Sequence, residues 1–575
     1  MIDLRAKPFY LNDGDIAWVE ATLASLTKEE KLGQLFFDLS EGVPDEAYIR
    51  DRVEKTHIGG LRYMNLSPGD TRQHNRLYQK YSKVPLLISA NVEAGGSGAC
   101  RGGTRVGEPI KLAATGDPQY AYLQGLIGGR EASAVGCRCT FSPVVDLSMN
   151  WRNSAIATRA FSDQVQTVID FAVPNMKGLQ AGGLAVTMKH FPGDGVDERD
   201  QHYSNSVNSL SKEEWDATYG RVYSAMIENG VEVVMAGHIM QPAYQKHFDP
   251  DMTEQDLLPG SLCKELLTDL LRGQLGFNGL VVTDASHMVG MTCHMKRSDM
   301  LVQALNAGID MILYFNVAEE DFGYLNDALE KGTLTWVRVD EALTRILALK
   351  AHLGLHKNRE IDGDLSIVGC EAHQKIAAEV SDRSITLAKQ TGENIFPITP
   401  EKYPRIMLMP VNTPSSEFSK LTGNVSRSRK VAEELRDRLN ARGFQAELFV
   451  SPLEYKEKLR SVYDYKSSIK EFTDRYDLVI TIADSVAMGV TQRLSWDTPK
   501  GGFEVPWYVN ELPVVFVSVN CPFHLADVPQ IKNLINCYDS QPSTLDALVR
   551  KLTGESEFLG RSPVDVFCGK IDTRK

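Results

Sequence analysis

Lys189 and His190 close an apolar run, "LAVTMKH", and Asp200 and His202 follow in the same short segment. A buried strand has no structural need for ionisable side chains, so these residues are candidates for ligand binding or proton transfer. Asp200 and His202 are two positions apart, and an extended backbone points such side chains to one side. An aspartate that accepts a hydrogen bond from one imidazole nitrogen raises the basicity of the other. The pair is an acid/base candidate, although an Asp-x-His pair also occurs in loops by chance.

Asp284 follows a second apolar run, in the segment "GLVVTDASHM". A carboxylate at the end of a buried strand can cap the next helix, or it can act as a nucleophile that the strand holds rigidly. The spacing alone leaves both interpretations open.

Apolar runs alternate with helical patterns through the first part of the chain. Near-continuous apolar strands separated by helices are typical of parallel strands that helices cover. The runs lie at residues 35–40, 58–65, 84–91, 139–147, 183–191, 231–239, 279–286 and 309–315. Eight such units predict an α/β fold with a (β/α)8 barrel of the TIM type, and a doubly wound sheet is the alternative.

The active site of such a barrel lies at the carboxyl ends of its strands. Loops after strands often begin with polar helix caps, but Lys189 and His190 are not residues that cap helices well. The polar residues that the sequence places at these strand ends are Asn91, Glu93, Asp146, Lys189, His190, His238 and Asp284. We therefore expect them to surround one site.

A second α/β series begins after residue 400, with apolar runs at 405–412, 446–451, 477–484 and 512–520. It predicts a smaller sandwich domain, with a mostly parallel sheet between helices. We expect a barrel catalytic domain at 1–358, a linker and connecting helix at 359–400, and a C-terminal α/β sandwich domain at 401–575.

Composition makes several classes of protein poor candidates. The net charge of −13, with no Lys/Arg-rich block, argues against nucleic acid or an anionic membrane as the main partner. The N-terminus lacks the apolar core of a signal peptide, and no segment has about 18 uninterrupted apolar residues. The nine cysteines include no CxxC pair, so we expect reduced thiols and a cytoplasmic location. Cys137 and Cys139 are expected as small core side chains.

Several segments, in order along the chain, resemble glycoside hydrolase family 3, in particular its two-domain β-N-acetylglucosaminidase branch. "KHFPGDGVDERDQH" is similar to the family's Lys-His-Phe-Pro-Gly-His-Gly…Asp-x-His signature. "VPLLISANVEAGG" resembles its Asp-x-Glu-Gly-Gly strand end, and "NSAIATRAFSD" resembles its Asn-x-x-Ile-x-x-Arg-Ser-Phe segment. "GLVVTDASHM" is similar to the strand that carries the family's nucleophile, and "GESEFLGRSPV" to its closing segment.

The resemblance implies a role for each matching residue. Asp284 would be the catalytic nucleophile, His202 the general acid/base, and Asp200 the partner of His202. The expected sugar-binding residues are Lys189, His190, Arg159, Asn91 and His238. No metal or cofactor is implied.

Two positions depart from the family pattern. The family's sugar-binding aspartate on the third strand is Asn91 here, and the histidine of Pro-Gly-His-Gly is Asp194. Neither is expected to take part in bond cleavage, so turnover should survive. Both touch the expected sugar pocket or its wall, which leaves the identity of the sugar open.

We therefore expect an exo-acting, retaining β-N-acetylglucosaminidase whose partner is a small carbohydrate, acting as a monomer or homodimer. Because a neutral imidazole does not repel an anion, the same residues could accept phosphate, which makes a phosphorylase one alternative. A β-glucosidase or β-xylosidase of the same family is another, and a sugar-binding protein without turnover is a third.

Overall fold

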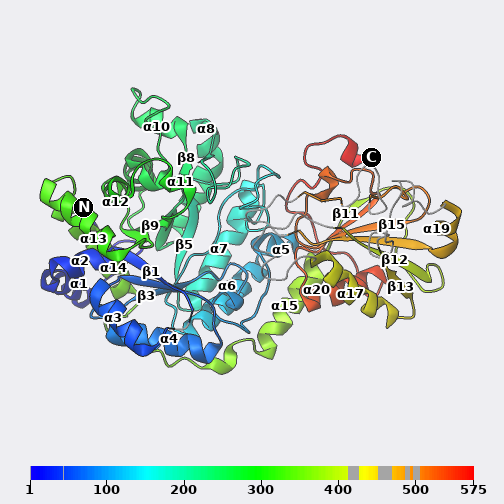
Figure 1. Ribbon diagram of the computed structural model, residues 1–575, viewed down its shortest axis with the longest axis horizontal. Helices are drawn as coiled ribbons and strands as arrows, with labels where there is room; N and C mark the ends of the chain where they lie inside the picture. The colour runs from blue at the N-terminus through cyan, green and yellow to red at the C-terminus, as the bar shows by residue number, and fades with distance from the viewer. Residues whose placement is uncertain (1, 43, 412–426, 451–468, 486–492, 497–504) are drawn as a thin grey trace, which may run out of the picture. The chain divides into compact units, whose positions relative to one another are not determined.

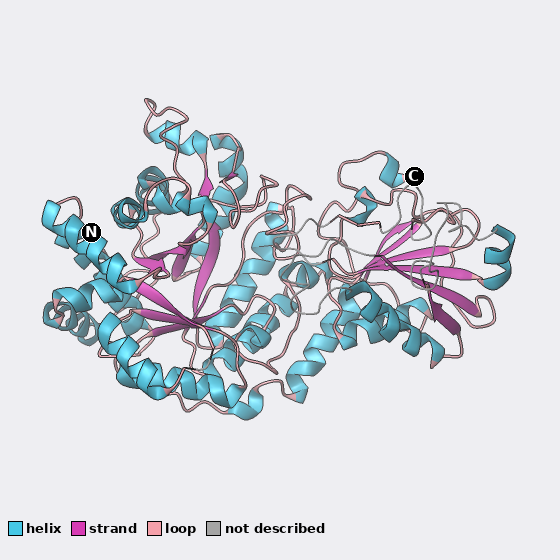
Figure 2. Cartoon of the chain, viewed as in Figure 1, coloured by secondary structure: helices cyan, strands magenta, loops and turns pink. Residues whose placement is uncertain are grey.

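We describe a computed structural model of the protein, in which all residues are described except 1, 43, 412–426, 451–468, 486–492 and 497–504. The chain forms two compact units. The first comprises Met1–Val106, Pro118–Ile156 and Ala160–Gln374, and the second comprises Gly107–Asp117, Ala157–Arg159 and Lys375–Lys575. Figures 1 and 2 show the helices and strands of both.

The first unit is a closed barrel of eight parallel strands, so the predicted barrel is confirmed. Neighbours around it follow the order β1-β10-β9-β7-β5-β4-β3-β2. The strands are β1 (Phe36–Ser40), β2 (Gly60–Tyr63), β3 (Leu87–Ala90), β4 (Cys139–Thr140), β5 (Ala185–Phe191), β7 (Val233–Ala236), β9 (Leu280–Ala285) and β10 (Met311–Leu313). Each lies within one of the eight apolar runs, because strands covered on both faces need apolar side chains throughout. Cys137 and Cys139 are buried, as expected.

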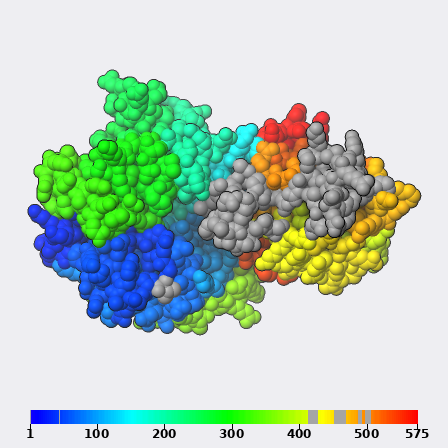
Figure 3. All heavy atoms as spheres, viewed as in Figure 1, coloured from blue at the N-terminus to red at the C-terminus, as the bar shows by residue number. Residues whose placement is uncertain are grey.

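Helices surround the barrel. The longer ones are α1 (Asp13–Ser25), α3 (Glu46–Thr56), α4 (Pro68–Tyr81), α6 (Gln119–Ala134), α7 (Val165–Ala181), α12 (Arg297–Ala307), α13 (Ala318–Lys331) and α14 (Trp336–His352). The shorter ones are α2 (Lys28–Gln34), α8 (Lys212–Trp215), α9 (Arg221–Glu228), α10 (Pro242–Phe248) and α11 (Val289–Thr292). The segment that contains α10 projects from the barrel unit (Figure 3). No described helix combines the length and the apolar composition needed to cross a bilayer.

The second unit contains a six-stranded sheet in the order β11-β16-β15-β14-β12-β13. Its strands are β11 (Thr386–Gln390), β12 (Arg405–Val411), β13 (Gln445–Leu448), β14 (Leu478–Ala483), β15 (Val514–Ser518) and β16 (Asn533–Asn536). Its helices include α5 (Pro109–Ala114), α15 (Glu371–Ser384), α17 (Arg427–Asn440), α19 (Ile469–Arg475) and α20 (Pro542–Leu552). Only β11 runs antiparallel to its neighbour, so the sheet is mostly parallel, as predicted.

Strand β11 was not expected, because the sequence pattern predicts that the helix continues to Gln390. The helix α15 ends at Ser384 instead, and the next residues pair with β16. The helix ends just before Ile385 and Thr386. Both residues are β-branched, and β-branched residues favour an extended backbone.

Asp310 connects several helices to the base of the barrel, at the start of β10. Its buried carboxylate contacts Arg272, Arg338 and Arg345 at 2.8, 2.9 and 3.3 Å, and it accepts a hydrogen bond from the Val281 N–H. These charges lie at the amino ends of the strands. In this fold, residues at that end contribute to stability rather than to catalysis.

Lys350, on α14, is fully buried and donates a hydrogen bond to Gln34 Oε1 at 2.6 Å. Burial lowers the pKa of Lys350 to about 7, whereas an unfolded lysine titrates near 10.4. Between these values the unfolded chain binds more protons than the folded one, so the free energy of unfolding rises with pH through this window. Below it, the lysine is charged in both states and the whole penalty of burying the charge is present.

We therefore compare the free energies of unfolding of Lys350→Met and the wild type at two pH values. We expect the difference in favour of the variant to be largest at about pH 6.5 and to be about 1 to 3 kcal/mol smaller at about pH 9.5. The lost bond to Gln34 affects the variant equally at both pH values, so the change in the difference is the quantity to measure. Urea denaturation of both proteins at the two pH values provides it. The exposed Lys331→Met serves as the control and should show no such change, and a constant difference for Lys350→Met would contradict the assignment.

Candidate active site

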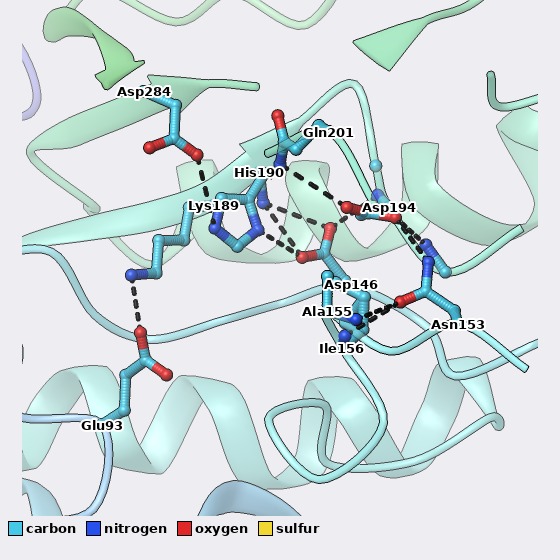
Figure 4. A network of polar contacts seen from close by, with 12 residues as sticks. Glu93, Asp146, Asn153, Ala155, Ile156, Lys189, His190, Asp194, Gln201 and Asp284 are labelled. Atoms are coloured by element: carbon cyan, nitrogen blue, oxygen red, sulfur yellow. Dashed lines mark hydrogen bonds and ion pairs between the residues drawn. The ribbon is translucent and has the colours of Figure 1, made fainter. Parts of the chain in front are cut away.

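Seven of the sequence-predicted site residues lie in the barrel unit at the carboxyl ends of its strands or in the loops that follow, and Asn91, just after β3, is one of them. Lys189 and His190 lie on β5, Asp284 on β9 and His238 just after β7, and Asp200 and His202 lie in the loop after β5. Figure 4 shows Asp284, Lys189 and His190 together with the polar network beneath them.

Lys189 pairs with Glu93, which lies in the loop after β3. Lys189 Nζ lies 2.6 Å from Glu93 Oε1, and the two side chains are 3% and 12% exposed (Figure 4). An ammonium held beside a carboxylate in this way offers hydroxyl groups both a donor and an acceptor.

The loop that carries Glu93 is anchored to α6 through Glu131. The buried carboxylate of Glu131 accepts hydrogen bonds from Thr104 N and Thr104 Oγ1, both at 2.7 Å. Gly95 has a φ of +116°, and a Cβ on Gly96 would lie 1.9 Å from Glu131 Oε2. The glycines "GG" in this segment therefore permit the close approach that fixes the loop.

His190 lies between two carboxylates. Its Nδ1 is 2.7 Å from Asp146 Oδ2, and its backbone N–H also donates to Asp146. Its Nε2 faces Asp284 Oδ2 at 3.9 Å (Figure 4). The Asp146 contact fixes Nδ1 as the donor nitrogen, so Nε2 is directed toward the position where a substrate would meet Asp284.

Asp284 has one oxygen engaged and one directed toward His190. Its Oδ1 accepts a hydrogen bond from the Ala285 N–H at 2.7 Å, and its side chain is 15% exposed. Burial acts to raise the pKa of Asp284, but the charges of His190 and His238 and the Ala285 amide outweigh it and lower the pKa to about 2. The carboxylate is therefore ionised at neutral pH, as a nucleophile must be.

His238 acts on this carboxylate through its neighbour. Its Nε2 donates to the Ala285 carbonyl at 3.0 Å, and its Nδ1 contacts Ser261 Oγ at 2.8 Å. Burial lowers the pKa of His238 to about 4, so the ring is neutral at pH 7. The neutral ring orients the end of β9 through its bond to the Ala285 carbonyl.

Asp200 and His202 form the expected pair. His202 Nδ1 lies 2.6 Å from Asp200 Oδ1, which also accepts from the His202 backbone N–H at 2.9 Å. The Asp200 side chain is 6% exposed, whereas that of His202 is 31% exposed, so the imidazole is accessible to a substrate. The backbone of this loop lies against the segment after Asp284, because Val289 N donates to His202 O at 3.3 Å.

Asp194, one of the two departures from the family pattern, is buried beneath the site. Its Oδ1 accepts hydrogen bonds from Asn153 Nδ2 and Gly195 N at 2.9 and 2.6 Å, and its own N–H donates to Asp146 at 2.8 Å (Figure 4). Burial and the charge of Asp146 raise the pKa of Asp194 to about 8.

One expected sugar-binding residue lies outside this network. The side chain of Asn91, just after β3, is exposed and makes no hydrogen bond with the described residues. Arg159 lies in the segment Ala157–Arg159, which groups with the second unit. The roles of both stay predictions. Gln201 and Ser261 were not predicted from the sequence, in which the only signal for Gln201 is its position between Asp200 and His202.

The described residues contain no group of three or more His, Cys, Asp or Glu side chains arranged to hold a metal ion. The groups that the site brings together are a nucleophilic carboxylate, an imidazole with its carboxylate partner, and a lysine beside a glutamate.

Asp146 accepts hydrogen bonds from His190 and from Asp194, and we expect Asp146→Asn to lower the free energy of unfolding by roughly 2–4 kcal/mol. The asparagine exchanges one acceptor oxygen for a donor NH2, which leaves a buried N–H without its acceptor. Urea denaturation at neutral pH measures the loss. Asp251→Asn, at an exposed position, is the control and should stay within about 0.5 kcal/mol of the wild type. An unchanged midpoint for Asp146→Asn would show that this carboxylate does not hold the site together.

The chain is similar to several glycosidases. It is 41% identical over 577 residues, with 100% of both chains covered, to a "Beta-N-acetylglucosaminidase/beta-glucosidase" of Cellulomonas fimi. Among solved structures it is similar to the "Beta-glucoside phosphorylase BglX", with 37% identity, 99% of each chain covered and a TM-score of 0.90. A family 3 β-N-acetylglucosaminidase from Paenibacillus sp. str. FPU-7 is 25% identical, with 95% of this chain and 100% of that chain covered and a TM-score of 0.76.

A model of the glycosyl hydrolase family 3 N terminal domain matches residues 27–349, which is more than half of the chain. The match spans the barrel strands and the loops that carry Asp284, Lys189, His190 and the Asp200–His202 pair. The chain belongs to glycosyl hydrolase family 3.

Proposed function

We propose that the protein is an exo-acting, retaining β-N-acetylglucosaminidase that removes terminal β-linked N-acetylhexosamine through a covalent glycosyl-enzyme. The observation that carries the proposal is the pairing of an ionised, largely buried Asp284 with an accessible His202 that Asp200 holds by its Nδ1. A retaining glycosidase needs a carboxylate nucleophile and a proton donor at the scissile bond. The name of the Cellulomonas fimi relative supports an N-acetyl sugar and also glucose as candidates.

In the first step, Asp284 Oδ2 attacks the anomeric carbon, and the bond from that carbon to the leaving oxygen breaks. His202, as the imidazolium, gives its Nε2 proton to the leaving oxygen. In the second step, neutral His202 takes a proton from water, whose oxygen attacks the anomeric carbon, and the bond to Asp284 breaks. The enzyme returns to its starting protonation state, and Asp200 stabilises the imidazolium at both stages.

Lys189, His190 and Glu93 would bind hydroxyls of the terminal sugar. The Lys189–Glu93 pair presents a donor and an acceptor side by side, and His190 Nε2 lies 3.9 Å from Asp284 Oδ2, beside the position where the sugar would meet the nucleophile. Asn91 and Arg159 are kept as candidates for further contacts to the sugar.

A phosphorylase is the second candidate. The solved structure at a TM-score of 0.90 carries the name of a β-glucoside phosphorylase. After the first step His202 is neutral, and a neutral imidazole does not repel a phosphate anion as a carboxylate would. Phosphate would then attack the anomeric carbon in place of water, the bond from that carbon to Asp284 would break, and a sugar 1-phosphate would be released.

The test follows release of p-nitrophenol from its β-N-acetylglucosaminide and its β-glucoside, with and without phosphate. We expect the wild type to prefer the N-acetyl sugar, Asp284→Asn to lose roughly a thousandfold or more in rate, and His202→Ala to lose roughly a hundredfold or more. Asp51→Asn, on an exposed face of α3, should match the wild type.

Mass spectrometry after incubation with an activated 2-deoxy-2-fluoro-β-glycoside should locate the trapped sugar on Asp284. A rate that rises with phosphate and yields a sugar 1-phosphate would support the phosphorylase. Full activity of Asp284→Asn, or a trapped sugar on another residue, would contradict the assignment of the nucleophile.

A further inference from the structure

We propose that Gln201 is a positioning residue that fixes the Asp200–His202 loop for proton transfer, with Asp194 as the acceptor for its amide. The inference rests on the proposed role of His202 as the general acid/base. Gln201 lies between the two members of the pair in the chain, and it is 1% exposed.

Three contacts tie Gln201 to three different elements. Its Oε1 accepts a hydrogen bond from the His238 N–H at 2.6 Å, just after β7. Its Nε2 contacts Asp194 Oδ2 at 3.5 Å, in the loop after β5 (Figure 4). Its backbone carbonyl accepts from the Gly290 N–H at 3.0 Å, in α11 after the strand that carries Asp284.

These contacts need a side chain at position 201 that offers one acceptor and one donor, as an amide does. The His238 N–H needs an acceptor, which places Oε1 toward β7 and therefore turns Nε2 toward Asp194. Both sides of the residue are tightly enclosed. A Cβ on Gly237 would lie 3.3 Å from Gln201 Oε1, and a Cβ on Gly290 would lie 2.8 Å from the Gln201 carbonyl oxygen.

Asp194 is itself held rigidly, so it can serve as an anchor. Asn153 donates to it, and that same Asn153 amide also donates to the Asp197 carbonyl at 2.8 Å. The Asp194 N–H donates to Asp146, which also holds His190. The loop of the acid/base is thus connected through Gln201 and Asp194 to the carboxylate that orients the sugar-binding side of the site.

The effect of this anchor should appear only where proton transfer limits the reaction. A leaving group such as 2,4-dinitrophenolate departs without a proton, whereas a sugar alcohol needs one from His202. Loss of the anchor displaces His202 and slows cleavage of a disaccharide, while attack by Asp284 on the dinitrophenyl glycoside continues.

The test compares kcat/KM for the β-N-acetylglucosaminide of 2,4-dinitrophenol and for the β-linked N-acetylglucosamine disaccharide. We expect Gln201→Met, which keeps the volume but removes both polar contacts, to lose roughly tenfold to a hundredfold on the disaccharide and less than about threefold on the dinitrophenyl substrate. His202→Ala should show the same selectivity to a larger extent.

Gln245→Met is the matched control. Gln245 is also fully buried, and it exchanges two hydrogen bonds with the Leu258 backbone at 3.0 Å, in the segment of α10. Its replacement removes a comparable pair of contacts that involve neither Asp200 nor His202, so it should change the two substrates by the same factor.

Gln201→Glu provides the conservative rescue. A protonated glutamic acid offers one acceptor and one donor, like the amide, whereas its ionised form has no donor for Asp194. Disaccharide cleavage by this variant should approach that of the wild type at acidic pH and fall as pH rises, relative to the dinitrophenyl substrate. This variant also keeps the test decisive if Gln201→Met folds poorly.

Equal losses on both substrates for folded Gln201→Met, or no loss on either, would overturn the role of Gln201. If His202→Ala itself showed no dependence on the leaving group, the proposed acid/base would be wrong instead, so the two failures can be distinguished.

Discussion

The site depends on the buried carboxylate of Asp146. This one group accepts hydrogen bonds from the backbone and the ring of His190 and from the backbone of Asp194. It thereby fixes the end of β5 and the first turn of the loop that leads to Asp200 and His202. A buried carboxylate that loses its hydrogen-bond donors is strongly destabilised, so we expect the hydrogen bonds to Asp146 to form and break together.

Asp146 lies between the two functional parts of the site, which are the nucleophile with the sugar-binding groups and the acid/base pair. On one side, His190 faces Asp284, whose ionised form it stabilises, and Lys189 pairs with Glu93. On the other side, Asp194 and Gln201 lead to the Asp200–His202 pair. Nucleophile and acid/base thus lie on separate elements, and contacts among buried polar groups connect them. Such contacts restrain their relative positions more firmly than the loops could by themselves.

The charged groups at the opposite end of the barrel serve a different purpose. Asp310 gathers three arginines at the start of β10, and Lys350 is buried with only Gln34 as its hydrogen-bonding partner among the described residues. Neither group is part of the proposed mechanism. Their separation from the site follows the general rule for this fold, in which the amino ends of the strands contribute to stability and the carboxyl ends to activity.

The sequence by itself determined the eight barrel strands, because strands buried on both faces need continuous apolar runs that are visible without any contact information. It also predicted Asp284, Lys189, His190 and the Asp200–His202 pair as candidates, because ionisable residues at the ends of apolar runs are conspicuous. Strand β11 was missed, since its pairing with β16, far along the chain, overrides a local helical pattern.

Only the tertiary structure decided which polar groups meet. The contacts of Gln201 with His238 and Asp194, and of His238 with Ser261, join residues from different strands and loops. An amide or a hydroxyl leaves no periodic pattern in the sequence, and its partner depends on how the strands close into a barrel. The low pKa of Asp284 has the same origin, because it results from the charges and donors that surround the carboxylate rather than from its neighbours along the chain.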